Sequence, residues 1–205
     1  MKTGMTPDEI IALLGNPPDN KLRGDHDLNP GMRPDGSQGE PLTPAAVLIG
    51  LVDHPDELTV LFTQRTDHLL HHPGQISFPG GHMDPGDKTP EDTALRETEE
   101  EVGLHSRHIE PIGRLGKYVT RTGFSITPVV ALITPPFDVS PDPFEVDEVF
   151  EVPLEFLLDP VNHQRHTREF KGQTREFHAM PYGEYYIWGA TAGMLFNLYE
   201  VLRQP

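Results

Sequence analysis

Three glutamates, Glu97, Glu100 and Glu101, lie close together in the middle of the 205-residue sequence. On a helical wheel with Glu97 at zero, Glu100 falls at roughly −60° and Glu101 at roughly +40°, so the three share one side of a helix. Crowded carboxylates repel one another, and a hard divalent cation such as Mg²⁺ or Mn²⁺ relieves that repulsion between them and substrate phosphates. The spacing therefore predicts a metal site. An alternative role for one glutamate, Glu100 for example, is that of general base.

Local signals define the helix that positions these carboxylates. Thr89 is a good N-cap, Pro90 suits the first helical position, and Asp92 holds the reciprocal position of a capping box. Gly103 is placed to end the helix in a left-handed conformation. Ahead of this helix, Gly80-Gly81 allows a close backbone approach to a metal or phosphate. A solvated acidic helix is the simpler interpretation, but it does not explain these flanking residues together.

The loop and helix resemble the Nudix hydrolase motif, which reads Gly, five residues, Glu, seven residues, then Arg-Glu-apolar-x-Glu-Glu-x-Gly-apolar. The matching residues are Gly81, Arg96, Glu97, Glu100, Glu101, Gly103 and Leu104. Asp87 stands where the motif has Glu, eight residues separate it from Arg96, and Thr98 replaces an apolar residue. The resemblance implies an α/β class fold, a Nudix-type α/β/α sandwich with a mixed β-sheet. It also implies that Arg96 orients the glutamates in the catalytic site and that Gly81 belongs to the metal site.

The preceding segment resembles the signature of the Nudix coenzyme A pyrophosphatases. The matches are Thr63, Arg65, Leu69, His72, Gly74, Gln75, Phe78 to Gly81, and Asp84. Leu70 replaces an arginine that the signature usually has. This resemblance implies hydrolysis of the diphosphate of coenzyme A or its derivatives, giving 3′,5′-ADP and 4′-phosphopantetheine species, with Arg65, His72 and Gln75 binding the substrate. The alternatives are a Nudix pyrophosphatase for ADP-ribose, NADH or dinucleoside polyphosphates, and a non-catalytic Nudix nucleotide sensor.

Several other polar residues are weaker candidates. Nudix enzymes often supply an extra carboxylate from a region like the one that holds Glu145 and Glu148, although ordinary surface charge explains either residue equally well. Further candidate phosphate partners are Arg33, Lys117 and Arg121. A zinc site is not expected, because the 11 histidines have no cysteine partners and form no His-Glu-x-x-His helix.

Composition limits the partners and the compartment. The formal net charge is −16, from 32 acidic residues against 16 Lys+Arg, so a broad basic surface for nucleic acid is excluded. A small-molecule substrate, coenzyme A or a derivative, is the expected partner. The sequence shows no apolar run of membrane-spanning length and no secretory signal, so we expect a cytoplasmic protein without a membrane partner. The oligomeric state is not predicted.

The order of patterns along the chain predicts one compact domain with an N-terminal arm. Residues 1–44 are expected to form a short helix over 6–14, ending at Gly15, and a Pro/Gly-rich arm that packs on the domain. Residues 45–205 form the Nudix hydrolase domain. Expected strands cover 45–52, 58–63, 76–78, 109–115, 125–132 and 146–152, followed by a short helix over 153–158 and a hairpin pair within 168–188. A terminal helix is expected over 190–202.

Overall fold

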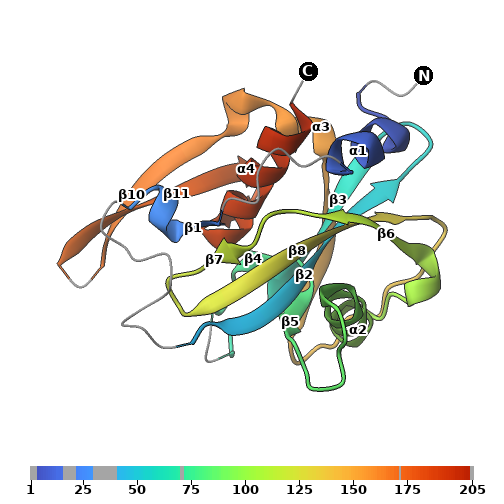
Figure 1. Ribbon diagram of the computed structural model, residues 1–205, viewed down its shortest axis with the longest axis horizontal. Helices are drawn as coiled ribbons and strands as arrows, with labels where there is room; N and C mark the ends of the chain where they lie inside the picture. The colour runs from blue at the N-terminus through green and yellow to red at the C-terminus, as the bar shows by residue number, and fades with distance from the viewer. Residues whose placement is uncertain (1–3, 16–21, 30–40, 70–71, 171, 204–205) are drawn as a thin grey trace.

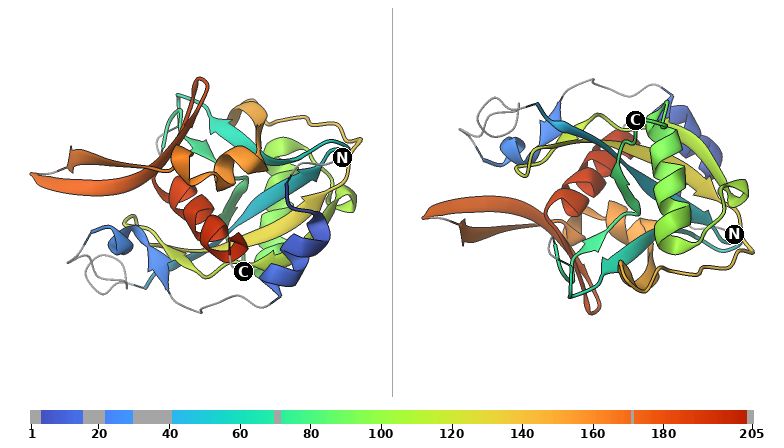
Figure 2. Two further views of the ribbon diagram at one scale, coloured as in Figure 1. Left: turned by 90° about the horizontal axis from the view of Figure 1, so that it is seen from above. Right: turned by 90° about the horizontal axis from the view of Figure 1, so that it is seen from below.

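A computed structural model describes residues 4–15, 22–29, 41–69, 72–170 and 172–203. Within these ranges a mixed β-sheet lies between helices on its two faces (Figure 1). The helices are α1 (Pro7–Leu14), α2 (Pro90–Val102), α3 (Leu154–Leu158) and α4 (Ala190–Leu202). Helix α2 covers one face, and α4 lies across the other, as the views from above and below show (Figure 2). The protein therefore has the expected α/β sandwich.

The main sheet has nine strands in the described residues. Along its principal path they run β1 (Arg23–Gly24), β7 (Tyr118–Val119), β8 (Phe124–Ile133), β2 (Thr43–Asp53), β3 (Leu58–Arg65) and β4 (Ile76–Ser77). Beside this path β5 (Gly80–His82) pairs with β2, β6 (Ile109–Arg114) with β8, and β9 (Val146–Pro153) with β3. β2 and β8 are parallel, whereas most neighbours are antiparallel, so the sheet is mixed as predicted.

The central strands are apolar on both faces because helices cover both faces. Along β2, Ala46 and Leu48 join the core beneath α2, whereas Val47 and Ile49 join the larger core beneath α1 and α4. This alternation follows the two-residue period of a strand. The expected strands at 45–52 and 58–63 are confirmed, and they form an antiparallel pair.

β2 and β3 stay paired only near their connecting turn. Leu51–Asp53 pair with Leu58–Val60, and nearer its start β2 pairs with β5 instead. β3 meanwhile pairs with β4 at Thr63 and Gln64. The short strands β4 and β5 therefore fill the space where β2 and β3 separate, and they carry the glycine loop to α2.

A second, three-stranded sheet follows, with β10 (Gln164–Phe170), β11 (Gln173–Tyr182) and β12 (Tyr185–Trp188) in antiparallel order. Gly172 and Gly183 occupy its two turns with positive φ, as the predicted hairpin pair requires. The first strand begins at Gln164, earlier than predicted, because its polar residues give no alternating apolar pattern.

The N-terminal helix is confirmed with its Thr6 cap, and Ile10 and Leu14 bury its inner side in the core beneath α4. The predicted arm over 16–44 is more structured than expected in its described part. Arg23–Gly24 form β1, which pairs in parallel with β7, and Thr43 already begins β2. Residues 16–21 and 30–40 of this arm lie outside the described residues, and the division at residue 44 stays a prediction.

No helix in the described ranges combines the length and apolar character that a membrane crossing needs.

Candidate active site

The ends of α2 are fixed by its own residues. Thr89 Oγ1 accepts a hydrogen bond from the Asp92 N–H at 3.2 Å, and the Asp92 carboxylate accepts one from the Thr89 N–H at 2.9 Å. At the other end Gly103 is left-handed, with φ of 72°. The predicted capping box and glycine stop are therefore confirmed.

The helical wheel also holds. Thr98 and Val102 are fully buried and Leu95 packs partly against the same core. Glu99 lies on the exposed side, where its carboxylate is 2.7 Å from His105 Nδ1. α2 thus presents an inner apolar face to the sheet and a separate carboxylate face to the glycine loop.

The three glutamates of that face differ in exposure. Glu101 is 5% exposed and accepts a hydrogen bond from the Gly80 N–H at 3.1 Å. Burial raises the pKa of Glu101 to about 7, and burial also raises the pKa of the half-buried Glu97. Glu100 is exposed. A Cβ on Gly81 would lie 2.5 Å from Glu97 Oε1, so the motif glycine leaves room for that carboxylate.

Arg96 holds two of these carboxylates. Its Nη1 donates to Glu97 Oε1 and to Glu100 Oε2, each at 2.9 Å. Its Nη2 donates to the carbonyl of His82 at 3.1 Å, which ties the helix to β5. The contact expected of Arg96, a salt bridge to the neighbouring glutamates, is therefore present.

Asp87, which departs from the Nudix motif, has a structural role. Its carboxylate accepts from Arg96 Nη2 at 3.0 Å, from Thr93 Oγ1 at 2.9 Å and from the Asp84 N–H at 2.9 Å. The hydrogen bond from Arg96, with the others, holds the pKa of Asp87 well below its usual range. Asp87 therefore fastens the loop to the start of α2. Sequence reasoning left this role open, because it depends on where the longer loop folds back.

Arg65 reaches the carboxylate face from a different element. It ends β3, and its Nη1 lies 3.7 Å from Glu101 Oε1. Its backbone N–H donates to the carbonyl of Gln75 at 3.0 Å, which joins β3 to the loop before β4. The predicted substrate-binding arginine is thus brought to the glutamates.

His72 and Gln75 contact each other instead. His72 Nδ1 lies 2.9 Å from Gln75 Oε1, and His72 is exposed with φ of 55°. None of their described hydrogen bonds reaches a glutamate of α2. In this arrangement His72 and Gln75 brace the loop that follows β3. Leu70, which replaces the arginine of the signature, lies outside the described residues.

The two candidate extra carboxylates separate in space. The negative charge of Glu145 lies near enough to help raise the pKa of Glu97 and of Glu101. Glu148 accepts a hydrogen bond from Tyr185 Oη at 2.8 Å, on the side of the sheet where Tyr185 packs with the α4 core. Glu145 is therefore the one that faces the candidate site.

The site matches a hard cation by its donor chemistry. In the described part of the chain, no three His, Asp or Glu groups already converge as a metal-binding cluster, and Glu100 is turned toward Arg96. However, Glu97 and Glu101 carry raised pKa values, and Glu145 adds to their repulsion. Carboxylate oxygens beside a glycine suit Mg²⁺ or Mn²⁺, which would relieve this charge.

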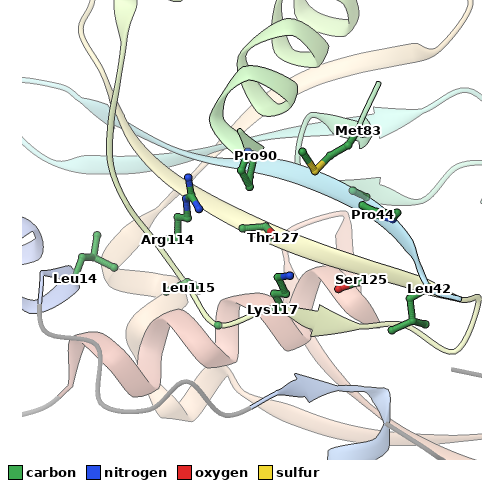
Figure 3. Close-up of a pocket in the computed structure, with 12 residues that line it drawn as sticks. Leu14, Leu42, Pro44, Met83, Pro90, Arg114, Leu115, Lys117, Ser125 and Thr127 are labelled. Carbon is green, nitrogen blue, oxygen red and sulfur yellow. The ribbon is translucent and has the colours of Figure 1, made fainter. Parts of the chain in front are cut away.

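A cavity of about 710 Å³ borders the start of α2 (Figure 3). Pro90 and Met83 lie on one side of it, and Arg114 and Lys117 on the other. Neither Arg65 nor the three glutamates line it. Arg114 is already paired with Glu91 of α2. The cavity therefore neighbours the glycine loop without containing the carboxylate face.

Together the sandwich fold, the glycine loop and the carboxylate helix define an α/β protein with a candidate site for a divalent cation. The NUDIX domain model matches residues 41–172. The Escherichia coli K12 protein named uncharacterized Nudix hydrolase NudL is 40% identical over 156 residues, covering 75% of this chain and 80% of that protein. Its namesake in Photorhabdus laumondii is 36% identical over 159 residues, covering 78% and 84%. The chain belongs to the Nudix hydrolase family.

Among solved structures, a NUDIX hydrolase from Alicyclobacillus acidocaldarius matches 78% of this chain and 91% of its own, with 19% identity and a TM-score of 0.48.

Proposed function

We propose that this Nudix hydrolase cleaves the diphosphate of coenzyme A and its derivatives, releasing 3′,5′-ADP and 4′-phosphopantetheine species. Family membership makes the chain a hydrolase of pyrophosphate bonds in nucleoside diphosphate derivatives. The choice of coenzyme A rests on the segment from Thr63 to Asp84, whose motif resembles the coenzyme A pyrophosphatases.

The position of Arg65 is the observation that supports this proposal most directly. Its guanidinium lies at the border of the carboxylate face, 3.7 Å from Glu101 and partly exposed. An arginine there can donate paired hydrogen bonds to one phosphate of a substrate whose diphosphate lies at the glutamates. We assign Arg65 to the substrate, with His72 and Gln75 shaping the loop beside it.

The roles in the reaction follow from the positions. Glu97, Glu100 and Glu101 would hold Mg²⁺ or Mn²⁺, with the Gly81 backbone beside them and Glu145 as an extra carboxylate. The bound cation would neutralise diphosphate charge and lower the pKa of an attacking water. Arg96 orients Glu97 and Glu100. One of the three glutamates, Glu100 for example, would instead serve as the base that accepts a proton from that water.

A hydrolysis screen tests the substrate. Coenzyme A, ADP-ribose, NADH and diadenosine polyphosphates are each incubated with the protein and Mg²⁺ or Mn²⁺, and products are identified by mass. We expect the highest kcat/KM for coenzyme A. A higher value for another compound would replace the proposal with the broader pyrophosphatase alternative, and binding without hydrolysis would favour a nucleotide sensor.

The role of Arg65 is tested with 3′-dephospho-coenzyme A. If Arg65 contacts the 3′-phosphate, wild type prefers coenzyme A and Arg65→Ala loses most of that preference. An unchanged preference in Arg65→Ala would assign Arg65 a structural role.

Dependence on metal has its own measurement. Excess chelator should abolish hydrolysis, and Mg²⁺ or Mn²⁺ should restore it. Full activity in chelator contradicts the assignment of the glutamates to a cation.

A cytoplasmic location and the lack of a nucleic-acid partner stay predictions from composition.

A further inference from the structure

The β10–β11 ribbon projects from the body of the protein (Figure 2). Among the described residues β10 has a partner on one side only, since the strand order is β10-β11-β12. A two-stranded ribbon is marginally stable in water by itself, and an unpaired edge strand is a template for another chain. The outer edge of β10 is therefore a candidate interaction surface.

Hydrogen bonds on β11 show which backbone groups of β10 point outward. The Glu176 N–H donates to Asn29 Oδ1 and the Glu176 carbonyl accepts from Asn29 Nδ2, both at 3.0 Å. Both groups of Glu176 thus point away from β10. Its cross-strand partner Thr167 belongs to the same non-hydrogen-bonded pair, so the N–H and carbonyl of Thr167 point outward too. By alternation, those of Arg165 and Glu169 do the same.

The side chains along this edge have a two-fold pattern. Arg165, Thr167 and Glu169 share one face of β10, and all three are exposed. Neither Arg165 nor Glu169 takes part in a described ion pair. An antiparallel second β10, related by a two-fold axis through Thr167, would place each Arg165 opposite a Glu169. Opposite charges directly across two strands stabilise their pairing.

Neighbouring registers lack this match. Centring the axis on Arg168 would place the two Arg168 side chains opposite each other, which is unfavourable. Centring it on His166 would leave Arg165 opposite Thr167.

The ribbon differs in net charge from the rest of the chain. Residues 164–178 contain four basic residues (Arg165, Arg168, Lys171, Arg175) and two acidic ones (Glu169, Glu176), a net charge of 4 − 2 = +2. The whole chain carries −16, so like-charge repulsion between two copies is weaker at this ribbon than over the acidic remainder of the chain.

We propose that two copies of this chain associate by antiparallel pairing of their β10 edges about Thr167, joining their three-stranded sheets into one. The occupant of the edge is a second copy because the complementary charges come from the same strand. This inference is independent of the substrate.

Sedimentation velocity of the full chain over the micromolar concentration range tests the pairing. Wild type should show a reversible monomer–dimer equilibrium. Arg165→Glu and Glu169→Arg should each weaken the dimer about tenfold or more, because two attractive pairs become repulsive. The double variant Arg165→Glu/Glu169→Arg should restore it. Arg107→Glu, an equal charge change at an exposed residue outside the ribbon, is the control.

Thr167→Cys gives a second test, because the chain has no cysteine. Across the axis two such residues lie within reach of a disulfide, so mild oxidation should yield a covalent dimer. Thr174→Cys, on the adjacent strand, should not. A monomeric wild type, single variants that dimerise normally, or a double variant that stays monomeric would each overturn the proposal. Circular dichroism confirms that every variant is folded.

Discussion

Helices α2 and α4 have the same length, 13 residues, and cover opposite faces of the same sheet, yet they are stabilised differently. α2 carries a capping box, a left-handed glycine stop and the Arg96 network. α4 begins at Gly189 without a side-chain cap and instead buries much of its surface, including Leu195 and Leu198.

The difference shows how a helix of low apolar content can remain in place. α2 cannot bury its carboxylate face without cost, because each buried charge loses hydration. Local caps and ion pairs compensate for part of that cost. α4 depends on tertiary burial, which contributes most of the stability of ordinary helices. The chain thus keeps its candidate metal site on one face of the sheet and most of its packing on the other.

Replacement of the α2 carboxylates should have the largest effect. Glu97→Gln, Glu100→Gln and Glu101→Gln should each lower kcat by about a hundredfold to ten-thousandfold, because a ligand or base is lost while the shape is kept. Glu99→Gln, on the exposed side, should stay near wild type. Steady-state kinetics with coenzyme A measure this, and equal losses at all four positions would contradict the division of the helix into two faces.

Shortening a core side chain of α4 should have the opposite result, a loss of stability with catalysis kept. Leu195 is 1% exposed, so Leu195→Ala should lower the free energy of unfolding by about 2–5 kcal/mol. The folded fraction should keep a normal kcat, since Leu195 is remote from the carboxylate face. Denaturant titration gives the stability, and Ile11→Ala at an exposed site of α1 should change it by about 0.5 kcal/mol or less. A selective loss of kcat in Leu195→Ala would contradict the separation of catalysis and packing between α2 and α4.

Low pH should lower the free energy of unfolding through His178, which packs on α4. Burial, with the nearby charge of Arg165, lowers the pKa of His178 to about 4, and its ring stacks on Phe196 of α4. In the unfolded chain the His178 ring binds a proton near pH 6.5. The stabilisation from neutral His178 in the folded protein is therefore complete above that pH and is lost as the pH falls toward 4.

We expect a loss of about 1–2 kcal/mol, reduced from the full linkage value because the ring is partly exposed. Unfolding of wild type and His178→Phe at several pH values measures the difference. An identical pH dependence in both proteins would show that His178 makes no contribution.

Loss of the α2 cap should have the smallest effect. Thr89→Ala removes the acceptor for the Asp92 N–H and should cost about 1 kcal/mol of stability. Thr89→Ser keeps the hydroxyl and should stay close to wild type. If Thr89→Ala is as stable as Thr89→Ser in thermal unfolding, the cap does not contribute.

Local patterns in the sequence define α2 and α4 almost to the residue. Caps act between residues three or four positions apart, so Thr89, Asp92 and Gly103 are sufficient to define the ends of α2. The contact of Arg96 with Glu100 fits the i,i+4 spacing of a helix, whereas its contact with the adjacent Glu97 was expected only from the Nudix resemblance. The long apolar strands were also predictable, because two covered faces require continuous apolar runs.

Tertiary structure decided what depends on distant segments. β5 is three residues with two glycines, and it is a strand only because β2 separates from β3 beside it. Glu145 lies near the glutamates because it occupies the turn just before β9, whereas Glu148 lies within β9 and contacts Tyr185. The approach of Arg65 to Glu101 also depends on tertiary structure: residues far apart in sequence meet only through the register of the sheet.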